Sequence, residues 1–338
     1  MNRVVIKNKV LESIDSKENV ILINECIKSS KENEALFFLK PEFFAIEKIE
    51  QIELMLSMIL DKIKEFDIDI SGVLTLKGDF LKEAKIIERH YGFINRMSLD
   101  GSKLLTDLDL GKIKQVLSVP SLKEYKIFGG HELVKAYDDI DEKKVTDMWY
   151  EKVSYRIGEG FYIQVHDIKE EKVIIINGFN PHQIKHFTSP DSKIVLFLLQ
   201  TDTDWFTLRN AFVGDTYPEN AYEGSIRNLL FKDSVKYGIK AISVADNFVH
   251  ASSGPFDSLF EICNFVSNIK GINFSRRNTN IYYLMKEKYG LGDAEFDKAL
   301  ENPAAEINGL KTDLFTFTKN RNTYESVADY VKYFKDTV

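Results

Sequence analysis

Four short apolar runs constrain the fold of this chain most strongly, because each has the length of a buried strand. They span residues 35–40, 70–77, 193–200 and 241–249. Apolar residues at three- and four-residue spacing follow the first, second and fourth runs, over 43–66, 79–90 and 255–269, and predict helices there. This order predicts an α+β fold, a ferredoxin-like split β-α-β sandwich with a four-stranded antiparallel sheet.

The segment between the second helix and the third strand is longer than such a sandwich needs. It contains helical patterns near 102–118 and 142–154 and two expected strands at 161–167 and 172–177. We therefore predict a core at 35–92 and 190–270, interrupted by an inserted α+β subdomain at 93–189. Residues 1–34 form a charged N-terminal extension, and residues 271–338 form a helical C-terminal extension.

Composition excludes several classes of protein. The 338 residues carry a net charge of −7, which argues against a basic surface for nucleic acid. No stretch reaches the roughly 18 apolar residues of a membrane span, and the N-terminus lacks an apolar signal segment. Cys26 and Cys263 form neither a disulfide framework nor a metal-ligand pattern. We expect a soluble cytoplasmic protein with no nucleic-acid or membrane partner.

The most informative polar segment is 246–255, which places His250 at the end of an expected strand. Asn247 and Ser252 flank it, and Glu261 follows inside an otherwise apolar helix. Because Asn247 and His250 are three residues apart, they cannot share one strand face, so the chain should leave the sheet near His250. A lone histidine is usually structural, but a helix beginning at Pro255 would place amide groups where a phosphorylated imidazole benefits from them.

Basic residues elsewhere form a plausible polyphosphate cradle. Lys40 ends the first strand, and Arg209 and Arg227 flank a glycine- and proline-containing loop that includes Thr216. The alternative interpretation is an ordinary surface loop with solvated arginines. A Ser/His/carboxylate hydrolase is the competing chemistry, but no Gly-x-Ser-x-Gly elbow is present, so the pattern favours histidine as the nucleophile.

The combined pattern resembles the nucleoside diphosphate kinase family. The matching segments are 36–42 with Lys40, Tyr91 after His90, 214–218 with Thr216, 224–227 with Arg227, and 247–252 continuing to Glu261. The resemblance covers 35–92 and 190–270, less than half of the chain. It describes a divergent member with a large insertion and extensions at both ends.

The resemblance implies a ping-pong phosphotransferase that uses ATP or another nucleoside triphosphate and a nucleoside diphosphate, with Mg²⁺ on the phosphates. It makes His250 the nucleophile, and Glu261 the group that binds its other ring nitrogen. Ser252 would support both. The implied nucleotide contacts are Lys40, Tyr91, Arg209, Thr216 and Arg227 on the phosphates and Asn247 near the sugar and terminal phosphate. No protein ligand to a metal is assigned, and the family's usual assemblies imply a homo-oligomer.

This sequence departs from the family pattern at several points. Arg209 lies one residue farther from Thr216, extra residues separate Arg227 from Asn247, and the usual Gly-Ser-Asp after the histidine is 251–253, Ala-Ser-Ser. The insertion begins where the family builds the helical lid over the base, so Phe93, Phe179 and Phe187 are the candidates for base stacking. The alternative function is a catalytically quiet nucleotide-binding regulatory or scaffold protein. The phosphoryl acceptor, base specificity and pathway stay open.

Overall fold

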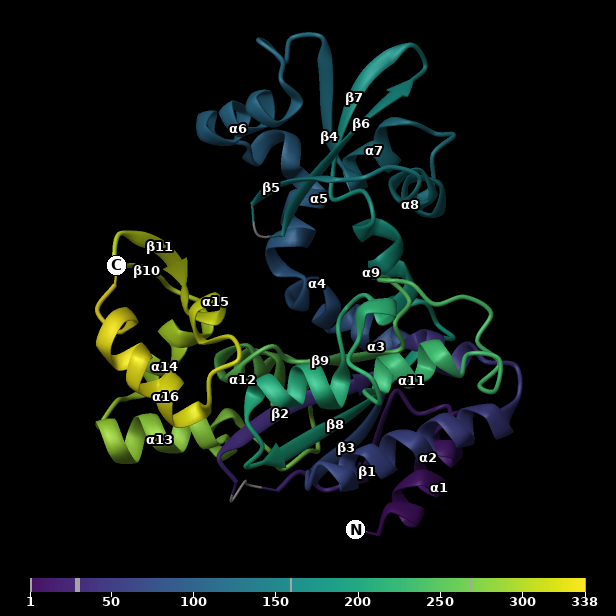
Figure 1. The fold of residues 1–338 in the computed structure, drawn as a ribbon, viewed down its shortest axis with the longest axis vertical. Helices are drawn as coiled ribbons and strands as arrows, with labels where there is room; N and C mark the ends of the chain where they lie inside the picture. Colours follow the sequence, from purple (N-terminus) through teal and green to yellow (C-terminus); the bar gives the residue numbers. More distant parts are fainter. Residues whose placement is uncertain (1, 28–30, 159, 268, 338) are drawn as a thin grey trace. The chain divides into compact units, whose positions relative to one another are not determined.

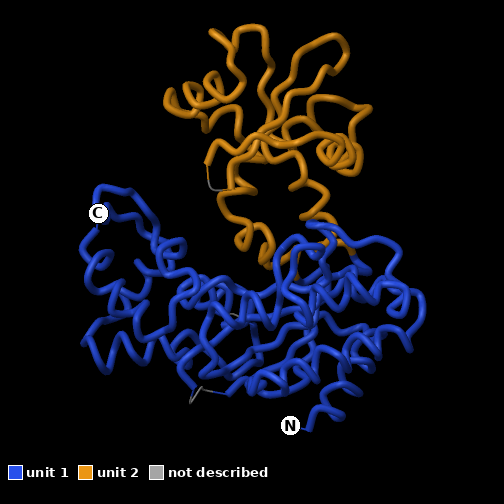
Figure 2. The backbone as a smooth tube through the Cα atoms, viewed as in Figure 1, with its two compact units in different colours: residues 1–80, 190–338 blue, residues 81–189 orange. Residues whose placement is uncertain are grey.

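The computed structural model describes residues 2–27, 31–158, 160–267 and 269–337 (Figure 1). The chain forms two compact units, Met1–Phe80 with Pro190–Val338 and Leu81–Ser189 (Figure 2). The remaining positions, 1, 28–30, 159, 268 and 338, lie outside the described residues. They belong to the predicted segments 1–34, 93–189, 190–270 and 271–338. Within the described ranges, no helix combines the length and apolar character needed to cross a membrane.

The first unit contains a five-stranded sheet with the strand order β1-β3-β8-β2-β9. Every neighbouring pair is antiparallel. The strands are β1 Val20–Asn24, β2 Asn33–Leu39, β3 Asp69–Lys77, β8 Lys193–Thr201 and β9 Val249–Ala251. The expected four-stranded sheet is therefore wrong in strand number. The apolar patch at 20–23 pairs with β3 as an edge strand, Val20 opposite Leu76, and satisfies backbone groups that β3 would otherwise expose.

The expected strand at 241–249 is wrong over most of its length, because regular pairing begins only at Val249. Before it, two hydrogen bonds close a turn. The Ser243 amide donates to the Asp246 carbonyl, and the Asp246 amide donates to the Ser243 hydroxyl oxygen. Phe248 has a φ of +68°, in the left-handed region that a strand cannot contain. The polar turn residues therefore outweigh the apolar composition of this segment.

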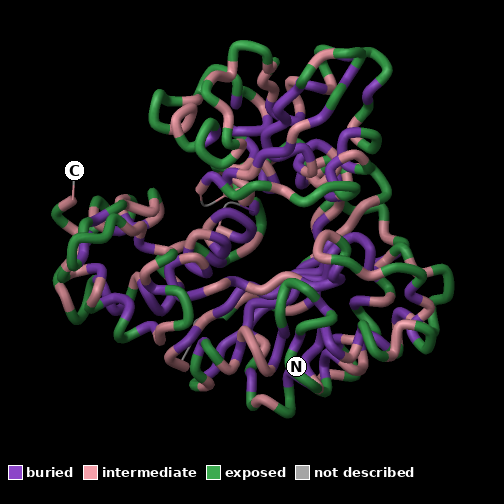
Figure 3. Tube along the Cα trace, turned by 45° about the horizontal axis from the view of Figure 1, so that its top comes forward, coloured by how far each residue is buried: buried purple, intermediate pink, exposed green. Residues whose placement is uncertain are grey.

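The main core lies between the sheet and the helices on one of its faces. The predicted helix at 43–66 begins later, as α2 Ile49–Glu65, because Pro41–Ala45 forms a separate 3₁₀ turn. The buried face of α2 packs with α1 Arg3–Ser13 and with Phe37 and Phe197 of the sheet. The central strands are almost wholly buried, as the purple segments in Figure 3 show.

The helix after β9 is α12 Pro255–Phe265, four residues shorter than expected. Its Phe256 and Leu259 pack into a second core made by the C-terminal segment. That segment comprises η4 Arg276–Asn278, α13 Asn280–Tyr289, α14 Asp293–Leu300, β10 Ala304–Ile307, β11 Leu310–Asp313, α15 Leu314–Thr318, α16 Thr323–Asp329 and a π turn, Tyr330–Phe334.

The sequence predicts a helical C-terminal segment, but β10 and β11 form an antiparallel hairpin within it. Asn308 and Gly309 connect these strands with φ values of +53° and +78°. An Asn-Gly pair with both residues at positive φ favours a two-residue hairpin turn. The Asn-Gly turn signal lies between helical patterns, which is why the structure contains a hairpin where the sequence predicts only helices.

The second unit has its own four-stranded sheet, in the order β4-β7-β6-β5. The β4–β7 pair is parallel, and the other two pairs are antiparallel. Its elements are α4 Ile86–His90, α5 Gly92–Leu104, α6 Asp107–Leu117, β4 Tyr125–Gly129, α7 Gly130–Ala136, α8 Glu142–Tyr150, β5 Tyr155–Gly158, β6 Phe161–Ile168, β7 Glu171–Ile176 and α9 Asn180–Thr188.

Two of the predicted helices are divided. The pattern at 79–90 forms α3 Gly78–Glu83 and then α4, because Lys85 has a φ of +51° between them. The pattern at 102–118 is broken at Thr106, whose hydroxyl accepts a hydrogen bond from the Asp109 amide. The Asp109 carboxylate accepts one from the Thr106 amide, which completes a capping box and begins α6.

Candidate active site

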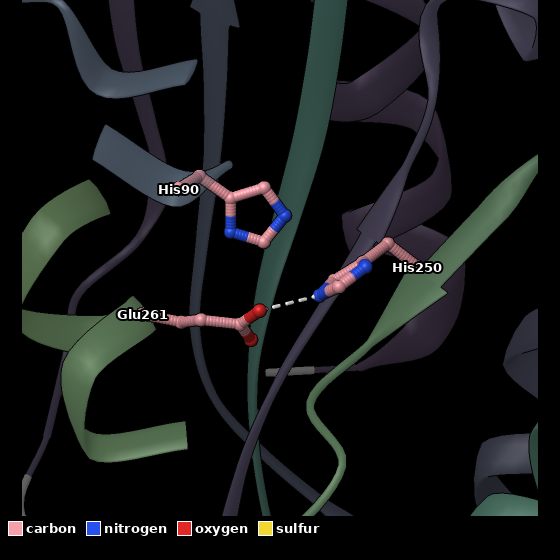
Figure 4. Close-up of side chains that lie close together, drawn as sticks. All are labelled: His90, His250 and Glu261. Carbon is pink, nitrogen blue, oxygen red and sulfur yellow. Dashed lines mark hydrogen bonds and ion pairs between the residues drawn. The ribbon is translucent and has the colours of Figure 1, made fainter. Parts of the chain in front are cut away.

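His250 lies on β9, at an edge of the large sheet, and is bound to a buried carboxylate. Its Nε2 lies 2.7 Å from Oε1 of Glu261 on α12 (Figure 4). The Ser252 hydroxyl donates to the other Glu261 oxygen, Oε2, at 2.5 Å. Because Glu261 is only 2% exposed, these two bonds compensate for much of the cost of burying its charge. The structure thus brings together three of the predicted site residues in one hydrogen-bonded chain.

Ser252 connects this chain of bonds to the sheet. Its Oγ accepts a hydrogen bond from the Leu36 amide at 3.1 Å, and its own amide donates to the Leu36 carbonyl at 3.0 Å. Phe38, the β2 residue opposite His250, stacks on the His250 ring with the centroids 4.5 Å apart and the planes 20° apart. The imidazole is therefore held both in its plane, by Glu261, and on one face, by Phe38.

The electrostatic surroundings of His250 favour the neutral imidazole. Burial lowers the pKa of His250, and the positive charges of Arg227 and Lys40 lower it further, whereas Asp257 opposes them. The side chain nevertheless keeps 24% of its surface exposed. A neutral, partly accessible imidazole at neutral pH can act as a nucleophile or as a base.

Lys40 is buried at the end of β2 and is bound by several oxygen atoms. Its Nζ lies 2.6 Å from the Ala245 carbonyl, 3.2 Å from Oδ1 of Asn247 and 3.2 Å from Oε1 of Glu42. Asn247 in turn donates from Nδ2 to the carbonyl of Thr216 at 3.2 Å. Lys40, Asn247 and the Thr216 loop are therefore joined, next to the strand that carries His250.

The backbone immediately before His250 is strained. Phe248 is buried with a φ of +68°, a conformation that costs a bulky residue about 1–3 kcal/mol. It is held there from both sides, because its amide donates to Glu42 Oε1 at 2.9 Å and its carbonyl accepts from the Lys40 amide at 2.9 Å. Lys40 and Glu42 therefore fix the course of the chain into β9.

Arg227 reaches this region from the first turn of α11 Ile226–Lys232. Its Nη1 donates to the Gly214 carbonyl at 2.9 Å and its Nη2 to the Val249 carbonyl at 2.8 Å. Burial lowers the pKa of Arg227 to about 10, so the guanidinium stays charged at neutral pH. Gly214 has a φ of +96°, and a Cβ there would lie 2.5 Å from Ser225 Oγ, so this approach requires glycine.

Arg209 occupies a π-helical turn, Leu208–Val213, in which the Gly214 amide donates to the Arg209 carbonyl at 3.0 Å. This i→i+5 bond spans one residue more than an α-helical bond. The turn therefore holds one residue more between Arg209 and Gly214 than an α-helical turn would. The Arg209 Nη1 donates to Oδ1 of Asn320, a residue of the C-terminal segment, at 2.6 Å.

Two further predicted contacts, Thr216 and Tyr91, lie in different units, Thr216 in the first and Tyr91 in the second. The Thr216 side chain is exposed, and its carbonyl accepts a hydrogen bond from Asn247. Tyr91 lies in the second unit, directly after α4, and packs there against Phe187. Phe93 and Phe179 also belong to that unit, where Phe179 packs on Trp149. The roles of Tyr91 and the three phenylalanines stay predictions.

Three residues of the site lack an assignment from the sequence. Glu42 binds Lys40, and Asn320 binds Arg209. Asp257, in the first turn of α12, accepts a hydrogen bond from the Ser253 amide at 2.7 Å. Burial and the neighbouring Glu261 raise the pKa of Asp257. An acidic residue in a helix's first turn is a recognisable capping signal, but nothing local to Asn320 indicates its contact with Arg209.

Comparisons with known proteins give structural similarity alone. No protein-family profile matches the chain, and no curated protein matches its sequence. One similar solved structure is the apo nucleoside diphosphate kinase of Encephalitozoon cuniculi, at 12% identity and a TM-score of 0.34, over 69% of this chain and 88% of that one. Another is the kinase of the same name from Pyrobaculum aerophilum, at 17% identity and a TM-score of 0.35, over 70% and 96%. At these scores the similarity supports no functional conclusion, and the proposal below rests on the residues of the site.

Proposed function

We propose that this protein is a phosphotransferase that moves the γ-phosphoryl group of a nucleoside triphosphate to a nucleoside diphosphate or a related diphosphate through phospho-His250. The observation that carries the proposal is the bond between His250 Nε2 and the buried Glu261 carboxylate. A carboxylate oxygen can only accept, so the imidazole proton lies on Nε2 and the nucleophilic lone pair lies on Nδ1.

In the first half-reaction, Nδ1 of His250 forms a bond to the γ-phosphorus as the bond from that phosphorus to the β,γ-bridging oxygen breaks. The nucleoside diphosphate leaves with the electron pair of that bond. Glu261 stabilises the positive charge that develops on the ring, and Ser252 keeps the carboxylate in place. The second half-reaction is the reverse transfer to an acceptor diphosphate, so one site serves both substrates.

Cationic side chains near His250 support the assignment to a phosphorylated substrate. Arg227 and Lys40 are close enough for their charges to affect the pKa of the imidazole. Arg209 adds a third charge, which acts on the pKa of Arg227. Preorganised cations of this kind stabilise the charge that spreads over a transferring phosphoryl group. We assign these three residues, with Thr216 and Asn247, to binding the nucleotide.

The donor set is compatible with Mg²⁺ that binds together with the substrate. Mg²⁺ prefers oxygen ligands and is usually held by one or two carboxylates and by substrate phosphates. Near His250, Glu261 and Glu42 are bound to His250 and Lys40, whereas Asp257 and Asp215 act electrostatically on the arginines. Asp257 and Asp215 already accept hydrogen bonds from the Ser253 and Tyr217 amides, so Mg²⁺ would be bound by the substrate phosphates, where it supplies charge neutralisation. We expect the reaction to take place in the cytoplasm.

One observation favours the second candidate function, a catalytically quiet nucleotide-binding regulatory or scaffold protein. The Lys40 ammonium contacts three protein oxygens, of Ala245, Asn247 and Glu42, and so already stabilises the fold. In that case Lys40 would serve only to hold the strained backbone at Phe248, and His250 would not be phosphorylated.

Labelling with γ-³²P ATP and Mg²⁺ separates the two functions. We expect an acid-labile, base-stable phosphoprotein that is absent from His250→Ala and present in His166→Ala, a control at a buried histidine of the second unit. The labelled protein should then discharge onto a nucleoside diphosphate. Full labelling of His250→Ala would overturn the mechanism, and nucleotide binding without any label would favour the quiet protein.

A further inference from the structure

The turn between α15 and α16 lies against the loop that follows β9. The Asn320 amide donates to the Ser253 carbonyl at 3.3 Å. A Cβ on Gly254 would lie 2.9 Å from the Thr318 carbonyl oxygen and 3.1 Å from the Lys319 Cα. The backbones of the two segments are therefore in close contact, only three or four residues after His250.

The same turn binds Arg209. The Asn320 Oδ1 accepts a hydrogen bond from Arg209 Nη1 at 2.6 Å, the one side-chain bond recorded for Arg209 in the described part of the chain. Asn320 thus contacts both the loop after the nucleophile and one of the proposed phosphate-binding cations. Its φ of +65° is in the left-handed region, which asparagine tolerates better than most residues.

The turn is well anchored in the first unit. The Thr318 hydroxyl donates to the Leu314 carbonyl at 2.8 Å, and Arg321 pairs with Glu325 at 2.7 Å and with Asp329 at 3.0 Å. At the start of α16, the Thr323 amide donates to Oδ1 of Asn33 on β2 at 3.0 Å. Since β2 also pairs with β9, the turn and the nucleophile are held by the same strand.

The chemistry of the acceptor matters for Arg209. An amide oxygen directs the guanidinium but carries no charge, so Arg209 remains a full cation for a phosphate. A carboxylate at the same place would compete with the substrate for that cation. The remaining donors of the guanidinium fork give it the geometry for bidentate binding of phosphate oxygens.

We propose that Asn320 is a positioning residue that aims Arg209 at the substrate phosphates, which makes the C-terminal segment part of the nucleotide site. This inference rests on the function proposed above. It assigns the segment to substrate binding, whereas the sequence indicates only a helical C-terminal extension.

Two variants separate aiming from turn shape. Asn320→Gly keeps the left-handed backbone and removes the amide, whereas Asn320→Asp keeps the acceptor and adds a negative charge. We expect Asn320→Gly to raise the KM for the nucleoside triphosphate about fivefold to tenfold, with kcat changed less than about twofold. Asn320→Asp should raise KM further, and this excess should shrink at high salt, which screens the new charge.

The matched control is Asn308→Gly, at an asparagine with a φ of +53° in the β10–β11 turn. We expect wild-type KM for this variant, and thermal unfolding should show all three variants folded. If Asn320→Gly keeps the wild-type KM while the wild-type protein is labelled normally, the inference is wrong and the proposed function stands. If the wild type neither binds ATP nor becomes labelled, both fail. If Asn320→Gly unfolds, Asn320→Asp decides alone: a wild-type KM there overturns the inference.

Discussion

Replacement of Glu261 by glutamine is the sharpest test of the site, because it removes a charge and keeps the shape. The carboxylate accepts from His250 Nε2 at 2.7 Å and from the Ser252 hydroxyl at 2.5 Å. The glutamine side chain has one carbonyl oxygen and one amide NH₂ group, so it can accept a hydrogen bond from only one of these two donors, His250 or Ser252. Only Ser252 can reverse its role, since a hydroxyl also accepts, whereas His250 must keep donating for Nδ1 to stay nucleophilic.

The structure provides for that reversal. The Leu36 carbonyl lies 3.2 Å from the Ser252 hydroxyl and can accept its hydrogen bond. The hydroxyl oxygen can then accept a hydrogen bond from the new side-chain amide. The fold should therefore tolerate Glu261→Gln. The bond to His250 changes from a charged to a neutral acceptor, which weakens it by about 1–1.5 kcal/mol. Because this bond stabilises charge that develops during transfer, we expect phosphorylation of His250 to slow about tenfold.

The assay is single-turnover labelling by rapid quench with saturating γ-³²P ATP. The control is Glu53→Gln on α2, which removes a carboxylate that lies 2.6 Å from Lys7 Nζ. This variant protein should be labelled at the wild-type rate. Denaturant unfolding should show Glu261→Gln within about 1.5 kcal/mol of the wild type. A variant that is folded and labels as fast as the wild type would refute the role of the Glu261 charge. Glu261→Ala removes the acceptor of the His250 Nε2–H, whereas Ser252 can still donate to the Leu36 carbonyl, so this variant should lose about 1–3 kcal/mol of stability.

Two further predictions follow from the same region. The lowered pKa of His250 keeps the imidazole neutral as the pH falls through 6.5, so the initial labelling rate should be flat between pH 8 and pH 6; a rate that halves near pH 6.5 would contradict it. Gly214→Ala should bring its Cβ to 2.5 Å from Ser225 Oγ, displace the carbonyl that Arg227 binds, and weaken ATP binding measured by calorimetry. Its control is Gly224→Ala, with a φ of +76° but open space around the Cβ, which should lose stability without losing affinity.

Much of the site could be predicted from the sequence because its chemistry is local. Asn247, His250 and Ser252 lie within six residues of one another, and Glu261 follows on the next helix. The turn chemistry is local too, but the strand prediction at 241–248 rests on apolar composition, and in the structure the Ser243 turn and the positive φ of Phe248 replace that strand. The Asn308–Gly309 hairpin also differs from the prediction, because the helical periodicity on both sides of it favours a helix there.

The sequence by itself determined the α+β class with an antiparallel sheet and the polar segment that carries His250. It did so because apolar periodicity and capping residues act within a few positions along the chain. Only the tertiary structure decided which acceptor binds each donor. Glu42 on Lys40 and Asn320 on Arg209 are brought together by packing between distant segments, and no spacing within the sequence records such contacts. The bond from the Arg227 guanidinium to the Gly214 carbonyl also joins two separate turns, so packing rather than spacing along the chain forms it.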